Sequence, residues 1–185
     1  MLAEGGYEGL QMRLLAERAG VAPMTLYNRF GNKDDLILLA LQDILDSVGQ
    51  RQRERSEMGM AKIVTDAEIM ADQILATPRY AQAMARMLFT AQPGSPIVQT
   101  LLVSNVTQAR TQIAEMQELG ELGSEIDGRL LARTLGVSGW SSILLWMQGL
   151  VPDREFRKHH TRAPLLVLAP AMTPKTRAEF AHFLR

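Results

Sequence analysis

The sequence predicts an all-α protein. Apolar residues recur at intervals of three and four, as in the series Leu36, Leu39, Ala40, Ile44 and Val48, which is the spacing of one helix face. No segment sustains the alternation of apolar and polar residues that a half-buried strand shows. Glycines, prolines and capping residues divide the chain into segments of helical length.

Three helices are predicted first along the chain, each bounded by a local signal. The first, about Gln11–Ala19, ends at Gly20, because glycine readily adopts the left-handed backbone of a sharp turn. The second, Pro23–Phe30, begins with a proline, whose missing N–H is harmless in the first turn. The third runs from Asn32 to about Arg55. Its asparagine is a good N-cap, and two aspartates in its first turn suit the helix dipole.

A hinge at Ser56–Met60, which contains Gly59, is expected to separate these helices from the rest of the chain. Six further helices are expected, at about Ala61–Ala76, Arg79–Ala91, Pro96–Leu119, Glu125–Leu150, Asp153–Ala169 and Pro174–Leu184. Pro164 and Pro170 make the helix before the last the weakest of these predictions.

The first two helices are expected to pack on each other. The first offers an apolar face of Met12, Leu14, Leu15 and Ala19. Val21 is expected to fill the space between the helices, and Leu26 and Phe30, four residues apart, can both face inward. Four different side chains then remain outside: Met24, Thr25, Asn28 and Arg29. Such groups can contact thymine methyls, base edges and phosphates, so the pattern is typical of a helix-turn-helix.

The segment AERAGVAPMTLYNRFGNKDDLI resembles the DNA-binding signature of the TetR family of bacterial transcriptional regulators. The match is dense from about Gly6 to Leu38, and the remainder is similar only in length and helicity. The resemblance implies a helix-turn-helix DNA-binding domain with its connecting helix over residues 1–55. A helical effector-binding and dimerisation domain would follow over residues 56–185.

The resemblance also implies a set of DNA-contacting residues: Pro23, Met24, Thr25, Tyr27, Asn28, Arg29 and Lys33. Thr25 and Tyr27 would contact the phosphate backbone, and Lys33 would pair with a phosphate beside a helix N-terminus. Met24, Thr25 and Asn28 would read bases. From the residues alone, Tyr27 could instead pack in the core and Lys33 could be a solvated surface lysine.

Three features depart from the family pattern and weaken the expected DNA affinity. Most members have a complete helix before the Gly-Tyr segment, whereas Met1–Glu4 covers only its last turn, so this first helix is expected to be largely absent. Leu10 or Gln11 stands where a threonine often caps the first motif helix. Ala22 replaces the hydroxyl residue that often caps the recognition helix.

Charge gives no general attraction to DNA. The net charge is zero, and the first 55 residues hold seven Lys and Arg against eight Asp and Glu. Affinity must therefore come from a locally arranged face that a dimer presents twice. No apolar run reaches the roughly 18 residues of a membrane helix, there is no leader pattern, and the chain has no cysteine. We expect a cytoplasmic protein with no membrane partner and no cofactor.

Methionine and tryptophan are frequent in the second part, and they can be plain core or the wall of an apolar pocket. The resemblance favours a pocket for a small-molecule effector. The expected wall residues lie on two helix faces: Met84, Met87 and Leu88 on one, and Trp140, Leu144 and Met147 on the other. The resemblance also implies that two late helices form a four-helix bundle with a partner subunit. Whether the small residues from Gly136 to Ser142 serve the pocket or this dimer stays open.

Catalytic signals are weak. His159 and His160 are adjacent, so they point to different helix faces and cannot grip one metal ion. Glu155 and His159 could share an ion, but two ligands do not make a site. No phosphate loop, nucleophile elbow or HExxH motif is present, so we expect neither an enzyme nor a metal site. Two hypotheses remain: a homodimeric repressor released from a near-palindromic operator by an apolar or amphipathic effector, and a dimeric ligand-binding module whose DNA-binding head does not work.

Overall fold

The computed structural model describes residues 10–185, so the expectation of a truncated helix at Met1–Glu4 lies outside the described residues. Its helical elements are α2 (Met12–Arg18), α3 (Pro23–Phe30), α4 (Lys33–Arg53), α5 (Gly59–Ala76), α6 (Pro78–Thr90), α7 (Pro96–Val98), a π-helical turn η1 (Gln99–Val103), α8 (Ser104–Glu118), α9 (Gly128–Met147), α10 (Asp153–Leu168), a short 3₁₀ turn η2 (Ala169–Ala171) and α11 (Pro174–Glu179). Within the described residues, extended pairing is limited to one bridge between Leu122 and Met172. The predicted all-α class is confirmed.

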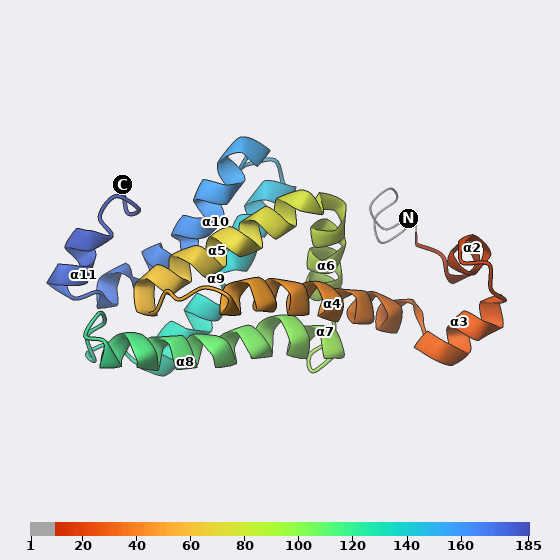
Figure 1. Ribbon diagram of the computed structural model, residues 1–185, viewed down its shortest axis with the longest axis horizontal. Coiled ribbons are helices and arrows are strands. Elements are labelled where there is room, and N and C mark those ends of the chain that lie inside the picture. Colours follow the sequence, from red (N-terminus) through yellow and green to blue (C-terminus); the bar gives the residue numbers. More distant parts are fainter. Residues whose placement is uncertain (1–9) are drawn as a thin grey trace.

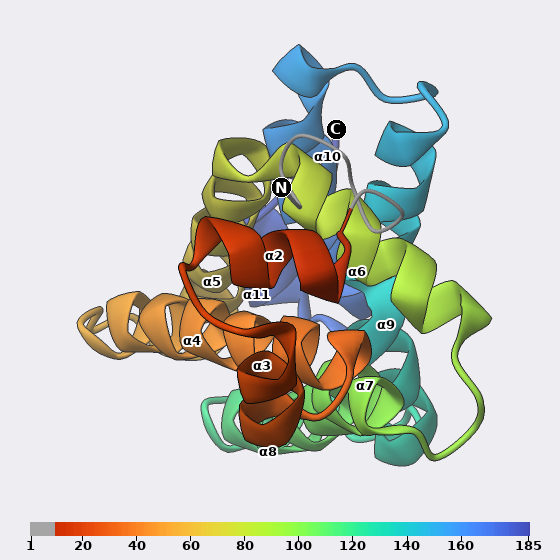
Figure 2. The same cartoon turned by 90° about the vertical axis from the view of Figure 1, so that its right-hand side faces the viewer.

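The molecule is elongated, with α2 and α3 at one end and α11 at the other (Figure 1). Helix α4 runs lengthwise from α3 into the body. Helices α5, α8, α9 and α10 form the body, in which α9 packs against both α8 and α10, and α5 packs against α10. Viewed end-on, α2 and α3 stand in front of the body (Figure 2).

The turn and the caps of the N-terminal helices follow the sequence signals. Gly20 has φ +67°. Its amide donates to the carbonyl of Glu17, and the amide of Val21 donates to the carbonyl of Ala16, which is a Schellman ending. Asn32 Oδ1 accepts hydrogen bonds from the two following aspartate amides at 2.8 and 3.0 Å, and the second aspartate accepts from the Asn32 amide in return. These bonds fix the angle at which α4 leaves α3.

The small core between α2 and α3 contains fewer of the apolar residues than predicted. Met12, Ala16 and Leu26 are buried there, with Leu15, Phe30 and Leu36 packed around them. Leu14 and Ala19 are exposed, because a helix of seven residues buries only one stripe at a spacing of four. The prediction for Val21 is wrong. It is 39% exposed, because it follows the Schellman turn with its amide bound to α2.

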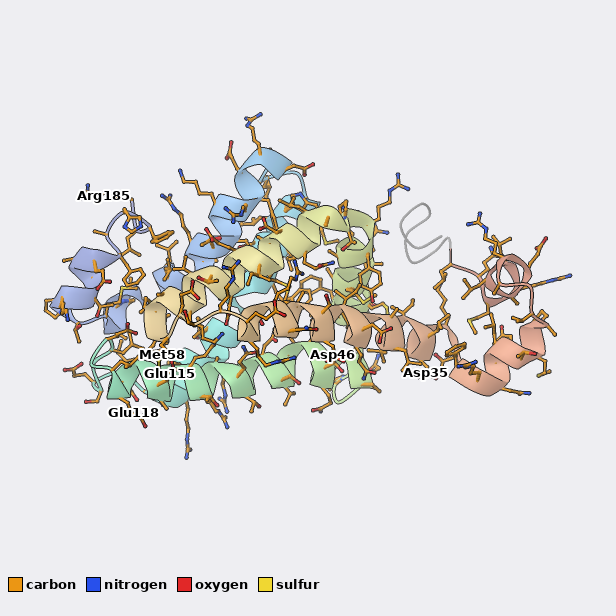
Figure 3. All side chains as sticks on the ribbon, viewed as in Figure 1. Asp35, Asp46, Met58, Glu115, Glu118 and Arg185 are labelled. Carbon is orange, nitrogen blue, oxygen red and sulfur yellow. The ribbon has the colours of Figure 1, made fainter. Side chains whose placement is uncertain are left out.

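Several helix ends differ from the sequence prediction. Helix α5 begins at Gly59, and its first amides are capped from α8 and the following loop: Glu115 accepts from the Gly59 amide at 3.1 Å and Glu121 from the Met60 amide at 2.7 Å. Figure 3 shows Met58, the last residue before α5, close to Glu115. Helix α9 begins at Gly128, because Asp127 caps it. The expected helix over residues 96–119 is present but contains the π-turn η1.

Two of the small residues in α9 serve contacts within the subunit. A Cβ on Gly136 would lie 2.8 Å from backbone atoms of Val106 in α8. A Cβ on Gly139 would lie 3.1 Å from the ring of His160 in α10. Glycine at these positions therefore lets α9 approach both neighbours closely.

Gly136→Ala should lower the free energy of unfolding by about 1 to 3 kcal/mol, because the added methyl group forces α8 and α9 apart. Denaturant unfolding of both proteins would measure the difference. Gly128→Ala is the matched control in the same helix, since nothing lies within 4 Å of the added carbon there. Equal stabilities for Gly136→Ala and the parent would contradict the close approach.

Candidate nucleic-acid interface and ligand cavity

Helix α3 presents its outer face to solvent at the end of the molecule (Figure 2). Six of the seven residues predicted to contact DNA are exposed on it: Pro23, Met24, Thr25, Tyr27, Asn28 and Arg29. Met24 is 66% exposed and Tyr27 48% exposed. Leu26 faces inward and holds the helix on the small core.

Two cations flank this face. Lys33 is half-buried at the first residue of α4, beside the capping box. The guanidinium carbon of Arg29 lies 5.5 Å from the centre of the Phe30 ring, which restricts that side chain on the outer face. Neither Gln11 nor Ala22 provides a side-chain cap for its helix. The amides at the start of α3 are therefore left without such a cap.

A cavity of about 160 Å³ lies between α4 and the body. Its lining is mainly apolar and includes Leu41, Ile44, Leu45, Ile74, Met84 and Trp140. Of the predicted wall residues, the structure brings Met84 and Trp140 together in this lining. Met87 and Leu88 are buried in the core beside it, Met147 is half-buried, and Leu144 is 41% exposed; none of these four lines the cavity.

The polar side chains of the cavity come from α5, α6, α8 and α10, and from Thr77 between α5 and α6. The Tyr80 hydroxyl of α6 donates a hydrogen bond to the carbonyl of Ile37 in α4, at 3.3 Å. Burial and the nearby Asp43 raise the pKa of Tyr80 above its usual value, so the hydroxyl keeps its proton. Thr77 Oγ1 donates to the Gln73 carbonyl, and the Gln73 side chain accepts from Arg51 of α4 at 2.7 Å.

Asn105 of α8 and His160 of α10 complete the polar side chains of this lining. His160 is 5% exposed and stacks on Phe156 with ring centres 5.3 Å apart. Burial, with a smaller contribution from His159, lowers the pKa of His160 to about 4. Its ring is therefore neutral at pH 7, and Nδ1 has no hydrogen-bond partner in the described part of the protein.

An open groove of about 700 Å³ runs between α9 and α10 on the far side of His160. It is lined by Val137, Ser138 and Ser141 of α9 and by Leu166 of α10, among others. His159 and Glu155 also line it, and His159 Nδ1 lies 3.2 Å from the Ser142 hydroxyl. The two adjacent histidines therefore face opposite sides of α10, as predicted.

Within residues 10–185, no group of three or more His, Asp and Glu side chains is placed to hold a metal ion. None of the helices described there combines the length and hydropathy that crossing a membrane requires.

Sequence reasoning missed most of the cavity wall. Leu41, Ile44 and Leu45 were assigned to a connecting helix, and His160 was considered only as a metal ligand. The apolar spacing of α4, which continues for two turns beyond the small core, is a signal that could have indicated a second contact. No local signal marks His160, because the groups around it come from other helices.

Comparison with known sequences places the N-terminal part among regulators. Residues 1–40 match the family described as bacterial regulatory proteins, tetR family. The HTH-type transcriptional regulatory protein RaaS of Mycobacterium tuberculosis is 25% identical over 140 residues, which are 76% of this chain and 63% of RaaS. The HTH-type transcriptional repressor KstR of Rhodococcus jostii is 34% identical over 94 residues, 49% of this chain and 43% of KstR. The matched stretches thus cover less than two thirds of either relative.

Solved structures share the fold over nearly the whole chain. A protein from Rhodococcus sp. assigned to the TetR-family transcriptional regulators superposes with a TM-score of 0.70 at 19% identity, covering 90% of this chain and 92% of that one. The fatty acid degradation regulator FadR from Bacillus halodurans gives 0.67 at 21% identity, covering 90% and 91%. The sequence relatives and these neighbours are regulators rather than enzymes, which agrees with the prediction that this chain is not an enzyme.

The buried neutral His160 should make stability depend on pH. Above pH 6.5 the ring is neutral in the folded and unfolded states. Between pH 6.5 and about 4, only the unfolded chain binds the proton, so the free energy of unfolding falls as the pH falls. The loss attributable to His160 is on the order of 3 kcal/mol by pH 4. Denaturant unfolding of the parent and His160→Phe across this range would measure it.

The contribution of His160 must be measured as the difference in unfolding free energy between the parent and the variant. Burial raises the pKa of Asp66, so Asp66 makes the folded protein more stable as the pH falls, opposite to the effect of His160. His182→Phe, at an exposed histidine, is the control and should follow the parent. If the curves of the parent and His160→Phe stay parallel, His160 is not held neutral.

Proposed function

We propose that this chain is a cytoplasmic repressor of the TetR family of bacterial regulatory proteins and that it binds a near-palindromic operator as a homodimer. A small apolar or amphipathic effector would release it. The observation that carries the proposal is the outer face of α3, where a thioether, hydroxyls, an amide and a guanidinium are exposed together. In this role residues 1–55 bind DNA and residues 56–185 bind the effector and the partner subunit.

The proposed DNA contacts divide into two kinds. Thr25 and Tyr27 would contact phosphates and fix the position of α3 in the major groove, with Lys33 beside them. Met24 and Asn28 would contact base edges and give sequence preference. Two copies of α3 would enter successive major grooves about 34 Å apart.

The α9–α10 groove is the proposed dimer interface. Leu130, Val137 and Leu144 of α9 and Leu166 of α10 are all exposed. Their burial against the same helices of a second subunit would complete a four-helix bundle, and apolar area removed from water contributes about 25 cal/mol per Å². The symmetric use of one patch is the usual form of a twofold dimer.

Helix α4 is the proposed link between effector and DNA. It contributes Leu41, Ile44 and Leu45 to the cavity and begins at the cap that sets the angle of α3. A ligand that occupies the cavity better in one position of α4 shifts the protein toward that position. If that position changes the distance between the two α3 helices, the operator is released.

A second candidate is a dimeric ligand-binding module with an inactive head. The absence of side-chain caps at Gln11 and Ala22 favours it, as does the near balance of charge in the first 55 residues.

Selection from a random-sequence duplex pool, followed by a salt titration, separates the two candidates. Enrichment of a palindrome whose affinity falls steeply with salt supports the repressor. Absence of enrichment at low salt, from a chain confirmed to carry its full N-terminus, would leave the ligand-binding module.

Asn28→Ala should relax preference at particular base pairs and cost about 1 to 3 kcal/mol on the preferred sequence. Tyr27→Phe should weaken binding about equally on all sequences, because a phosphate contact carries no base information. Repeating the selection with each variant measures both effects. An unchanged preference profile for Asn28→Ala would contradict its role in base reading.

Val137→Glu or Leu166→Glu should raise the dimer dissociation constant at least about a hundredfold, since each places an unpaired carboxylate in the interface. Sedimentation equilibrium would measure it. Leu119→Glu is the control, because Leu119 is exposed outside the groove. A dimer that persists in both groove variants would place the interface elsewhere.

Tyr80→Phe should weaken operator binding by the ligand-free protein about fivefold. The substitution removes the hydrogen bond to Ile37, which stabilises the observed position of α4 by about 1 kcal/mol. Fluorescence anisotropy with the selected operator measures the affinity. Phe89→Leu is the control on the exposed side of α6. Unchanged affinity for Tyr80→Phe would mean that this bond does not position α4 for DNA.

A further inference from the structure

The cavity beside α4 contains a polar side chain whose hydrogen-bonding capacity is not satisfied by the described protein. His160 is 5% exposed and its Nδ1 has no partner. By contrast, the Tyr80 hydroxyl is bonded to Ile37 and the Gln73 side chain to Arg51. A buried polar atom without a partner costs about 1 to 3 kcal/mol, so a ligand that supplies one gains affinity there.

The lining of the same cavity contains no Lys, Arg, Asp or Glu. Charged side chains lie only on its border. Arg51 is bonded to Gln73 of the lining, and Asp43 is near Tyr80. Asp66 lies in a neighbouring cavity that shares Asn105, Gly136 and Gly139 with this one. Asp66 is already paired with Lys62 at 2.9 Å. A charged ligand in the cavity would therefore lose its hydration without touching a lining side chain of opposite charge.

The backbone of α9 at Gly139 packs against the edge of the His160 ring and holds that ring at the cavity wall. A Cβ there would lie 3.1 Å from Cε1, 3.7 Å from Nε2 and 3.9 Å from Nδ1. Any larger residue at position 139 would occupy space next to both ring nitrogens.

We propose that this cavity binds an uncharged ligand with an apolar body and a hydroxyl group that hydrogen-bonds to His160. The inference rests on the proposed function for its biological meaning, but it concerns binding alone. A hydroxyl can donate or accept, so it suits either tautomer of a neutral imidazole. The lowered pKa of His160 agrees with this, because it keeps the ring neutral at pH 7. The apolar body would lie against Ile74, Met84 and Trp140.

Octanol, octanoate and octylammonium are matched probes, since they share a chain and differ in the head group. Binding to the full chain without DNA would be followed by calorimetry and by tryptophan emission, since Trp140, one of the two tryptophans, lines the cavity. We expect octanol to bind at least about tenfold more tightly than either ion at pH 7. Octanoate binding as tight as octanol, without uptake of a proton, would overturn the neutral class, because the bound species is then the anion. Tight binding of octylammonium would instead point to Asp66 and would also overturn it.

Variants test the role of the histidine. His160→Phe keeps a flat ring but removes both nitrogens, and it should weaken octanol binding about tenfold. His182→Phe, at an exposed histidine, should leave the affinity unchanged. Gly139→Ala keeps His160 but places a methyl group 3.1 Å from its Cε1, which displaces the ring, so it should also weaken octanol binding. Equal octanol affinity in the parent, His160→Phe and Gly139→Ala would overturn the inference.

The ligand-binding experiments and the DNA selection test the two proposals independently. If octanol binds as expected but the duplex selection recovers no operator, the ligand class stands and the repressor does not. If an operator is recovered but octanol does not bind, the repressor stands and the ligand class is overturned.

Discussion

Leu36, in the first turn of α4, packs against the small core of α2 and α3, while Leu41 of the same helix lies in the core of the body and lines the cavity. A single continuous helix therefore belongs to two cores. Leu10 and Ile37 are buried in the same cluster of the body core as Leu41. Because a helix is stiff over this length, a change in the cavity beside α4 that moves this helix would also move α3.

The contacts that hold α4 to the body are few and partly polar. They include the bond from Tyr80 to Ile37, the bond from Arg51 to Gln73, and a bond from the Gln52 side chain to the Asp66 carbonyl. By contrast, within the body α9 packs closely against α8 at Gly136 and against α10 at Gly139. The position of α4 on the body therefore depends on these hydrogen bonds together with the buried apolar contacts of Ile37 and Leu41.

The local sequence signals predicted the N-terminal third well. Gly20, Pro23 and Asn32 each act through the backbone within a few residues, so their effect is visible in the sequence. The prediction failed for Val21, where the exact end of a short helix decides the direction of a side chain. It was incomplete for Leu144, since helical spacing places it near Trp140 but does not say which arc of the helix is covered.

By itself, the sequence determined the helical class, the helix-turn-helix with its exposed face, and the resemblance of its N-terminal part to one family of regulators. These depend on helix periodicity, caps and turns, which act over short distances along the chain. Only the tertiary structure decided which apolar residues enclose a cavity and which lie on the surface, and it alone brought His160 beside Gly139 and left its Nδ1 without a partner. The physical reason is that a cavity is made by side chains from several helices, and its shape depends on how those helices pack.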